Sequence, residues 1–133
     1  MGSDFFICNT HSNFLEIRGE DCAEFLQGLI TNDIYKCQKN NPIYSCLLSP
    51  QGKFLADFFI FNINGSYFFE TNEKFYNNLL NKLKIYKLRS NIQIEEINDL
   101  YSYSIFKFDY KTDYIVLIND PRNNNLGKKL ILN

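Results

Sequence analysis

The sequence predicts an α+β domain in which two helices pack on a mainly antiparallel sheet. Short strand-like runs are joined by turn residues, and two segments with apolar residues at helical spacing lie among them. Hairpins that alternate with helices are typical of α+β domains. Apolar residues make up 45% and aromatic residues 17% of the 133 residues, so the chain has enough apolar surface to build a core.

The amino-terminal part predicts two short strands followed by a helix. Residues 5–8 and 14–17 are strand-like and are linked by a polar run. Asp21 and Glu24 have the spacing of a capping box, which marks a helix start. Residues 31–33 end this helix, because Asn and Asp favour turns. The apolar stripe between these signals consists of Cys22, Phe25, Leu26 and Leu29.

The central part predicts a strand, a hairpin and the second helix. Residues 43–48 are strand-like, and residues 53–63 are apolar almost throughout, which favours a strand covered on both faces. The Asn-Gly pair at 64–65 is a strong hairpin signal, so residues 66–71 return as the partner strand. Asn72 is the expected N-cap of a helix. The apolar face of that helix consists of Tyr76, Leu79, Leu80, Leu83 and Tyr86.

The carboxy-terminal part predicts further strands. Residues 91–97 form one candidate, and residues 101–108 and 113–118 are expected to form a strand pair. Residues 126–132 are a last short strand. The sheet is therefore expected to continue, or a second one to begin, after the second helix.

Charge and cysteine spacing exclude several classes of function. Fourteen Lys and Arg face fifteen Asp and Glu, so we expect neither direct nucleic-acid binding nor membrane binding. The cysteines show no C-x-x-C spacing, and no metal site is predicted. No secretory signal and no membrane-spanning run is visible, so reduced thiols and a cytoplasmic location are expected. The four cysteines are Cys8, Cys22, Cys37 and Cys46.

Asp57 is the residue that most invites a functional interpretation. It lies within an apolar strand, and alternation places it on one side with Leu55, Phe59 and Phe61. A carboxylate in such a place must be hydrogen-bonded, paired or directed into a cavity. A functional carboxylate and a structural one both satisfy this condition.

Two other polar segments are weaker candidates. Thr31, Asn32 and Asp33 follow the first helix and are either a helix stop or part of a site. Arg89 follows the second helix and is either a bidentate partner for a ligand carboxylate or a solvated cation. Glycine-rich phosphate loops, nucleophile elbows and H-E-x-x-H motifs do not occur in the sequence.

Four segments occur together in an order that is typical of a known family. They are residues 17–34 (I-R-G-E-D-C-A-E-F-L-Q-G-L-I-T-N-D-I), 47–58 (L-L-S-P-Q-G-K-F-L-A-D-F), 83–92 (L-K-I-Y-K-L-R-S-N-I) and 120–127 (D-P-R, then L-G). In these segments the chain resembles the YgfZ-type folate-binding proteins, which are relatives of the glycine-cleavage T-protein. The same group includes mitochondrial iron–sulfur assembly factors.

The resemblance implies a T-protein/YgfZ-like amino-terminal domain with tetrahydrofolate as its cofactor. In the T-protein, the segment that matches residues 52–57 carries the acidic residue associated with the folate. Asp57 is therefore the first expected folate-side residue, and no catalytic residue is assigned. The expected cofactor-binding residues are Asp57, Thr31, Asn32, Asp33, Arg89 and Phe58.

The resemblance further implies an accessory protein that supports iron–sulfur cluster assembly or repair and, through it, tRNA modification. Iron–sulfur client proteins would be its partners. A tetrahydrofolate-dependent aminomethyltransferase and a ligand-free interaction module are the two alternatives. The K-G-C-Y-x-G-Q-E motif of the YgfZ-type proteins does not occur. We therefore expect an amino-terminal portion, with a folate-binding domain over residues 1–98 and the start of a truncated second unit over 99–133.

Overall fold

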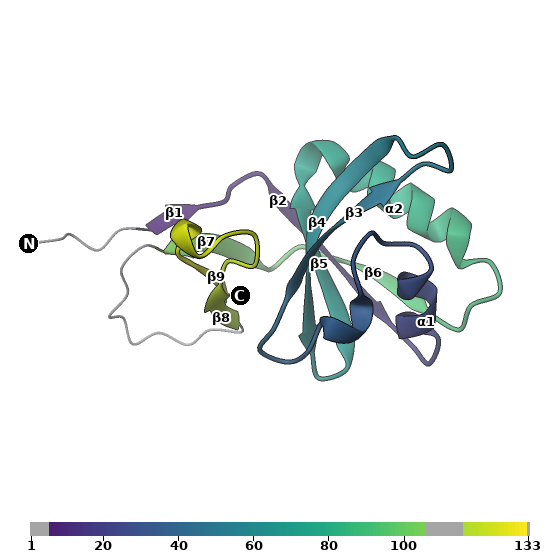
Figure 1. The fold of residues 1–133 in the computed structure, drawn as a ribbon, viewed down its shortest axis with the longest axis horizontal. Helices are drawn as coiled ribbons and strands as arrows, with labels where there is room; N and C mark the ends of the chain where they lie inside the picture. Colours follow the sequence, from purple (N-terminus) through teal and green to yellow (C-terminus); the bar gives the residue numbers. More distant parts are fainter. Residues whose placement is uncertain (1–5, 106–115, 133) are drawn as a thin grey trace, which may run out of the picture.

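Two antiparallel sheets form the frame of the molecule in the computed structural model, which describes residues 6–105 and 116–132 (Figure 1). The larger sheet has the strand order β3-β4-β5-β2-β6. Its strands are Ser12–Arg18 (β2), Ile43–Leu48 (β3), Phe54–Ile63 (β4), Ser66–Asn72 (β5) and Gln93–Ile97 (β6). The smaller sheet has the order β1-β7-β9-β8. Its strands are Phe6–Cys8 (β1), Tyr101–Ile105 (β7), Val116–Asn119 (β8) and Lys128–Leu132 (β9).

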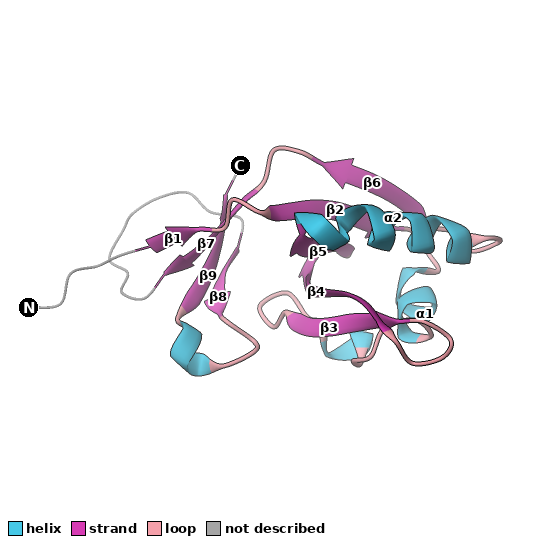
Figure 2. Ribbon diagram, turned by 90° about the horizontal axis from the view of Figure 1, so that it is seen from above, coloured by secondary structure: helices cyan, strands magenta, loops and turns pink. Residues whose placement is uncertain are grey.

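Two α-helices, Cys22–Gln27 (α1) and Glu73–Lys87 (α2), lie on the larger sheet, away from the smaller one (Figure 2). Two short 3-10 helices, Ile34–Lys36 (η1) and Asn124–Leu126 (η2), lie in connecting segments. The α+β class with a mainly antiparallel sheet and two packed helices is thus confirmed.

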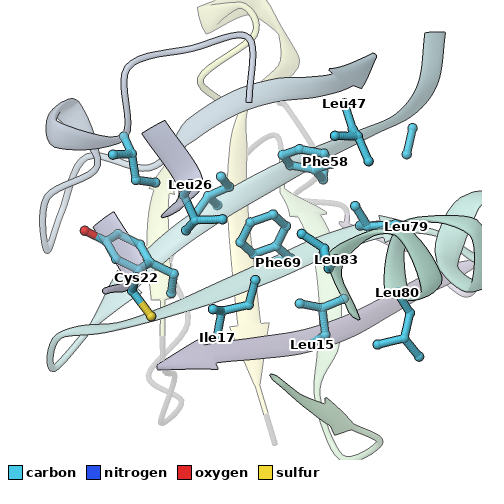
Figure 3. Packing of buried hydrophobic residues seen from close by; sticks show 14 of the residues in the cluster. Leu15, Ile17, Cys22, Leu26, Leu47, Phe58, Phe69, Leu79, Leu80 and Leu83 are labelled. Carbon is cyan, nitrogen blue, oxygen red and sulfur yellow. The ribbon is translucent and has the colours of Figure 1, made fainter. Parts of the chain in front are cut away.

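The hairpin and the second helix form where the sequence predicts them. Asn64 and Gly65 have φ values of 53° and 86°, the left-handed backbone that a tight hairpin turn requires. The Asn72 side chain accepts a hydrogen bond from the backbone N–H of Lys74 at 3.0 Å, as an N-cap does. The helix then buries one face against the sheet (Figure 3). That face consists of Tyr76, Leu79, Leu80 and Leu83.

The predicted capping box of the first helix is wrong. The Asp21 side chain makes no cap hydrogen bond in α1. Its carboxylate accepts the backbone N–H of Asn91 at 2.6 Å instead. The segment that enters β6 competes for this carboxylate, because an unpaired backbone N–H there needs an acceptor.

The larger sheet buries residues on both faces. One face, with Leu15, Phe58 and Phe69, packs against the helices and is called the helix-side core here. On the other face, Phe14 and Phe59 pack with Ile131 of the smaller sheet. The expectation that the 53–63 run is covered on both faces is confirmed, because β4 lies between β3 and β5 and contributes to both clusters.

A β-bulge interrupts the alternation near the start of β4. Consecutive residues of β3 pair with Ala56 and Phe54, so Leu55 has no opposite residue in that strand. Leu55 packs against the helix-side core, whereas Phe59 and Phe61 lie on the other face. The prediction that Leu55 shares their side is therefore wrong, because the bulge shifts the period of two by one residue.

The carboxy-terminal strands are arranged differently from the prediction. β7 and β8 are not neighbours, because β9 lies between them and pairs with both. Residues 106–108 and 113–115 of the predicted strand pair lie outside the described residues. The smaller sheet also takes in β1, which pairs with β7. The domain boundary near residue 98 stays a prediction.

Candidate functional site

A cavity of about 380 Å³ lies between the two sheets. The larger sheet contributes β3, β4 and β5 to its wall, and the smaller sheet contributes β7 and β9. The connection between β1 and β2 and the loop that contains Arg122 complete the wall. Its size falls within the range of small-molecule sites. The side chains that matter for its chemistry are Tyr44, Asp57, Phe59, Glu70, Arg122 and Lys129.

The cross-strand register explains why these side chains meet. Tyr44 of β3 lies opposite Phe59 of β4, and Phe59 lies opposite Glu70 of β5. Glu70 in turn lies opposite Phe14 of β2. Directly opposite residues share a face of an antiparallel sheet. The row therefore places a phenol, an aromatic ring and a carboxylate side by side on the face toward the smaller sheet.

Asp57 is half-buried and is held by hydrogen bonds to its side chain and its backbone. The Tyr44 hydroxyl donates to Asp57 Oδ2. The Thr71 hydroxyl donates to the backbone carbonyl of Asp57 at 2.7 Å. Burial, together with the hydrogen bond to the Asp57 carboxylate and its charge, raises the pKa of Tyr44 to about 12. Tyr44 therefore keeps its proton at neutral pH and remains a donor that orients the carboxylate.

Glu70 and Lys129 form a buried ion pair between the two sheets. Glu70 Oε1 lies 2.7 Å from Lys129 Nζ, and both side chains are 3% exposed. Lys129 Nζ also lies 3.3 Å from Ser102 Oγ and 4.1 Å from the centroid of the Phe59 ring. The second oxygen of Glu70, Oε2, has no hydrogen-bond partner among the described residues. A buried acceptor without a partner is uncommon in folded proteins.

The D-P-R segment contributes a second cation to the cavity. Arg122 Nη2 lies 2.6 Å from Asp120 Oδ2, and Arg122 Nε donates to Asp120 Oδ1 at 3.0 Å. Burial acts to raise the pKa of Asp120, but the hydrogen bonds and charge of Arg122 outweigh it and leave that pKa below its usual value. The guanidinium lies 4.8 Å from the Phe59 centroid, within the range of a cation–π contact.

The structure places the predicted residues Asp57 and Phe58 at this cavity. The Phe58 ring lies in the helix-side core, with its centroid 4.9 Å from that of Phe69 (Figure 3). Phe59, the next residue along β4, instead presents its ring on the cavity side. Phe59 therefore takes the place at the cavity that was expected for Phe58, because successive side chains of a strand point to opposite faces.

Thr31, Asn32 and Asp33 do not line this cavity. Thr31 Oγ1 accepts the backbone N–H of Cys46 at 2.9 Å, and Asn32 Nδ2 donates to the backbone carbonyl of Tyr44 at 2.9 Å. Asp33 caps η1 by accepting the N–H of Tyr35. The segment therefore fastens the loop after α1 to β3. Its link to the cavity is indirect, because it binds the backbone of Tyr44, whose side chain lines the cavity.

Arg89 lies away from Asp57, beside a separate cavity at the end of α2. That cavity is lined by residues of α1, the end of α2 and the segment that follows it, including Asp21, Tyr86 and Leu88. The structure thus does not bring Arg89 together with Asp57. Its predicted role toward a ligand stays a prediction.

Sequence reasoning missed Glu70 and Lys129 and did not weigh Arg122 or Tyr44 as site residues. Glu70 carries the same signal as Asp57, a carboxylate within an apolar strand, and could have been found. Arg122 lies in a segment already singled out by the family pattern. Lys129 offers no signal, because its burial depends on contacts with the other sheet.

The described part of the chain contains no group of three or more His, Cys, Asp or Glu placed to hold a metal ion. No helix within that part is long and apolar enough to cross a membrane. All four cysteines are free, and Cys22 and Cys37 are buried. Burial raises the pKa of both buried thiols to about 11.

Comparisons with known proteins place this fold among the T-protein relatives. An aminomethyltransferase from Caldanaerobacter subterraneus subsp. tengcongensis is 28% identical over 95 residues, which cover 68% of this chain and 24% of that protein. A mitochondrial iron–sulfur cluster assembly factor IBA57 homolog from Mycosarcoma maydis is 29% identical over 104 residues, which cover 68% of this chain and 26% of that protein. The chain thus spans about a quarter of the length of these relatives.

The structural comparison agrees on the fold. The crystal structure of the glycine cleavage system aminomethyltransferase T from Bartonella henselae superposes with a TM-score of 0.68 at 14% identity, over 77% of this chain and 28% of that one. The matches do not distinguish a YgfZ-type protein from other members, so that subtype stays a prediction. The model of the GCVT N-terminal domain matches residues 9–104. The chain therefore belongs to the GCVT N-terminal domain family.

Proposed function

We propose that this chain contributes a tetrahydrofolate-binding surface to an accessory protein that supports iron–sulfur cluster assembly or repair. The observation that carries the proposal is the cavity between the sheets, where the Asp57 carboxylate and the Phe59 ring lie within one lining. A folate has a flat heterocycle with amino groups and an anionic tail. Such a molecule needs aromatic surface, hydrogen-bond acceptors and cations, and the cavity has all three.

The residues present fit a folate-type ligand. Phe59 offers apolar ring surface, and Asp57 offers an acceptor that Tyr44 orients. When bound, the folate would supply a nitrogen that carries one-carbon groups. The residues of this chain would bind the ligand, orient it and keep a proton on the Tyr44 hydroxyl, whose pKa is raised to about 12 by burial and by Asp57.

The cellular part of the proposal rests on the relatives. IBA57 homologs, which carry the name of iron–sulfur cluster assembly factors, match at 29% identity. On this basis we propose iron–sulfur client proteins as partners, tRNA modification as a downstream process, a YgfZ-type subfamily and a cytoplasmic location. A client assay that follows cluster content of an iron–sulfur enzyme with and without the protein would test this part.

A folate-dependent aminomethyltransferase is the second candidate. Its support is the aminomethyltransferase relative, together with an Asp57 carboxylate that a protonated tyrosine holds at the cavity. A positioned carboxylate near a reacting nitrogen can act in proton transfer. Turnover of an aminomethyl donor in the presence of tetrahydrofolate would favour this candidate, whereas binding without turnover would favour the accessory protein.

The first experiment is an isothermal titration of tetrahydrofolate into this chain and, in parallel, into the longest native chain that contains it. Binding by both is the expected result and would place the main contacts within residues 1–133. Binding by the longer chain alone would mean that the site is shared with other segments. A failure of both to bind would overturn the folate proposal and leave the interaction module.

A further inference from the structure

One oxygen of a buried carboxylate in the cavity lacks the partner that its burial demands. Glu70 lines the cavity, and its side chain is 3% exposed. Its Oε1 pairs with Lys129, but Oε2 has no hydrogen-bond partner among the described residues. An ionised carboxylate accepts several hydrogen bonds, and a buried acceptor that makes none is costly. The free oxygen is therefore a feature that the fold alone does not explain.

The surroundings hold this carboxylate in place. Glu70 lies within β5, between Phe59 of β4 and Phe14 of β2. Lys129 binds Oε1 from the other sheet, and Ser102 and Phe59 contact the same ammonium group. A side chain held from both sheets is preorganised, so an incoming ligand does not have to order it.

The chemistry of Oε2 defines what can bind to it. A carboxylate oxygen only accepts hydrogen bonds, so its partner must present an N–H or O–H donor. A ligand carboxylate cannot meet this requirement, because an ionised carboxylate has no donor and would bring a like charge against Oε2. The amino-substituted end of a heterocycle meets the requirement, and an anionic tail does not.

We propose that Glu70 is a ligand-anchoring residue whose Oε2 accepts a hydrogen bond from the amino group of a bound heterocycle. The inference rests on the proposed folate binding and specifies in addition that the amino-substituted end of the ligand lies at β5. Glu70 then determines specificity, because the cavity discriminates against heterocycles that lack the amino donor. An analogue without that donor leaves a buried acceptor unpaired, and sites of this kind reject such analogues strongly.

The test compares two ligands on the native protein. Calorimetric titrations use tetrahydrofolate and its 2-desamino analogue, in which hydrogen replaces the amino group of the heterocycle. We expect the analogue to bind at least about tenfold more weakly. Equal affinities would overturn the role of Glu70 while folate binding itself stands. Absence of binding by tetrahydrofolate would overturn both the proposed function and this inference.

Two variants assign the discrimination to one side chain. Glu70→Gln should lower the ratio of the two affinities to about one, because its amide cannot satisfy both Lys129 and a ligand amino group. Glu20→Gln is the matched control, since Glu20 is exposed before α1, does not line the cavity and should keep the ratio. If Glu70→Gln kept the wild-type ratio of the affinities for tetrahydrofolate and the analogue, the proposal would be overturned. Should thermal unfolding show that this variant does not fold, Glu70→Asp replaces it, and the same loss of ratio is expected.

Discussion

At the scale of single residues, the cavity depends on two carboxylates that are satisfied in different ways. Asp57 receives the Tyr44 hydroxyl, and Glu70 receives the ammonium of Lys129. The first pair joins neighbouring strands of one sheet, whereas the second joins the two sheets. A substitution of Asp57 should therefore change ligand affinity mainly by removing a contact with the ligand. A substitution of Glu70 should also change ligand affinity by altering how the two sheets are held together.

The substitution Asp57→Asn tests the folate-side role of this carboxylate. The charge is lost while shape and volume are kept, so we expect a fall in tetrahydrofolate affinity of about tenfold or more in the intact protein. The Tyr44 hydroxyl can still donate to the remaining carbonyl oxygen, so the fold should persist. Calorimetry gives the affinity, and circular dichroism reports on the fold.

Asp33→Asn is the control for that experiment. Asp33 lies at the start of η1, where its side chain accepts the N–H of Tyr35 and does not line the cavity. The tetrahydrofolate affinity of this variant should stay within about twofold of the wild-type value, because an Asn also serves as a cap. Unchanged affinity in Asp57→Asn would remove Asp57 from the site.

At the scale of elements, the start of α1 is held close to the segment that enters β6. The Asp21 carboxylate accepts a hydrogen bond from the backbone N–H of Asn91, and the backbone N–H of Asp21 donates to the backbone carbonyl of Asn91. Gly19 lies at this contact with a φ of 129°. A Cβ atom on Gly19 would lie 2.4 Å from the Asn91 carbonyl oxygen. The close approach of the two backbones thus requires a glycine.

Gly19→Ala is therefore expected to be strongly destabilising. The clash and the unfavourable φ together should lower the free energy of unfolding by about 2 kcal/mol or more. Gly52→Ala is the matched control. It also has a positive φ, 82°, but no atom lies within 4 Å of the added Cβ, so it should cost only about 1 kcal/mol. Urea unfolding followed by circular dichroism measures both values, and equal losses would contradict the role assigned to the contact.

At the scale of the whole molecule, two kinds of contact join the sheets. Ile131 of β9 packs with Phe14, Phe59 and Phe61. The buried pair of Glu70 and Lys129 lies beside this cluster and shares the Phe59 ring with it. The apolar cluster supplies non-directional attraction, whereas the ion pair requires one relative position of the sheets.

Lys129→Met tests the weight of that pair. The variant keeps the volume but leaves the Glu70 charge buried and unpaired, which should destabilise the protein by about 3–5 kcal/mol. Adding Glu70→Leu should restore most of this loss, because both charges are then absent. Lys128→Met, at an exposed neighbouring position, should change the stability by less than about 0.5 kcal/mol. Thermal and urea unfolding measure these differences, and an additive double variant would contradict the coupling.

Local signals in the sequence were sufficient for most of the larger sheet and for α2. The Asn64 and Gly65 turn and the Asn72 cap form as predicted, because each depends on the conformational preference of one or two residues. The capping box at Asp21 and the side of Leu55 were mispredicted, because a distant backbone N–H and a β-bulge decide them. The expected pairing of residues 101–108 with 113–118 failed because β9, which comes later in the chain, lies between β7 and β8.

By itself the sequence determined the α+β class, the order of the elements and Asp57 as a residue of interest. Period and turn chemistry act over a few residues, so they can be read along the chain. Alternation along the strand already put Phe59, and not Phe58, on the side of Asp57. Only the tertiary structure decided that Glu70, Arg122 and Lys129 join Asp57 at the cavity. Those positions depend on strand register and on the contact between two sheets, and such long-range pairings leave no mark in local sequence.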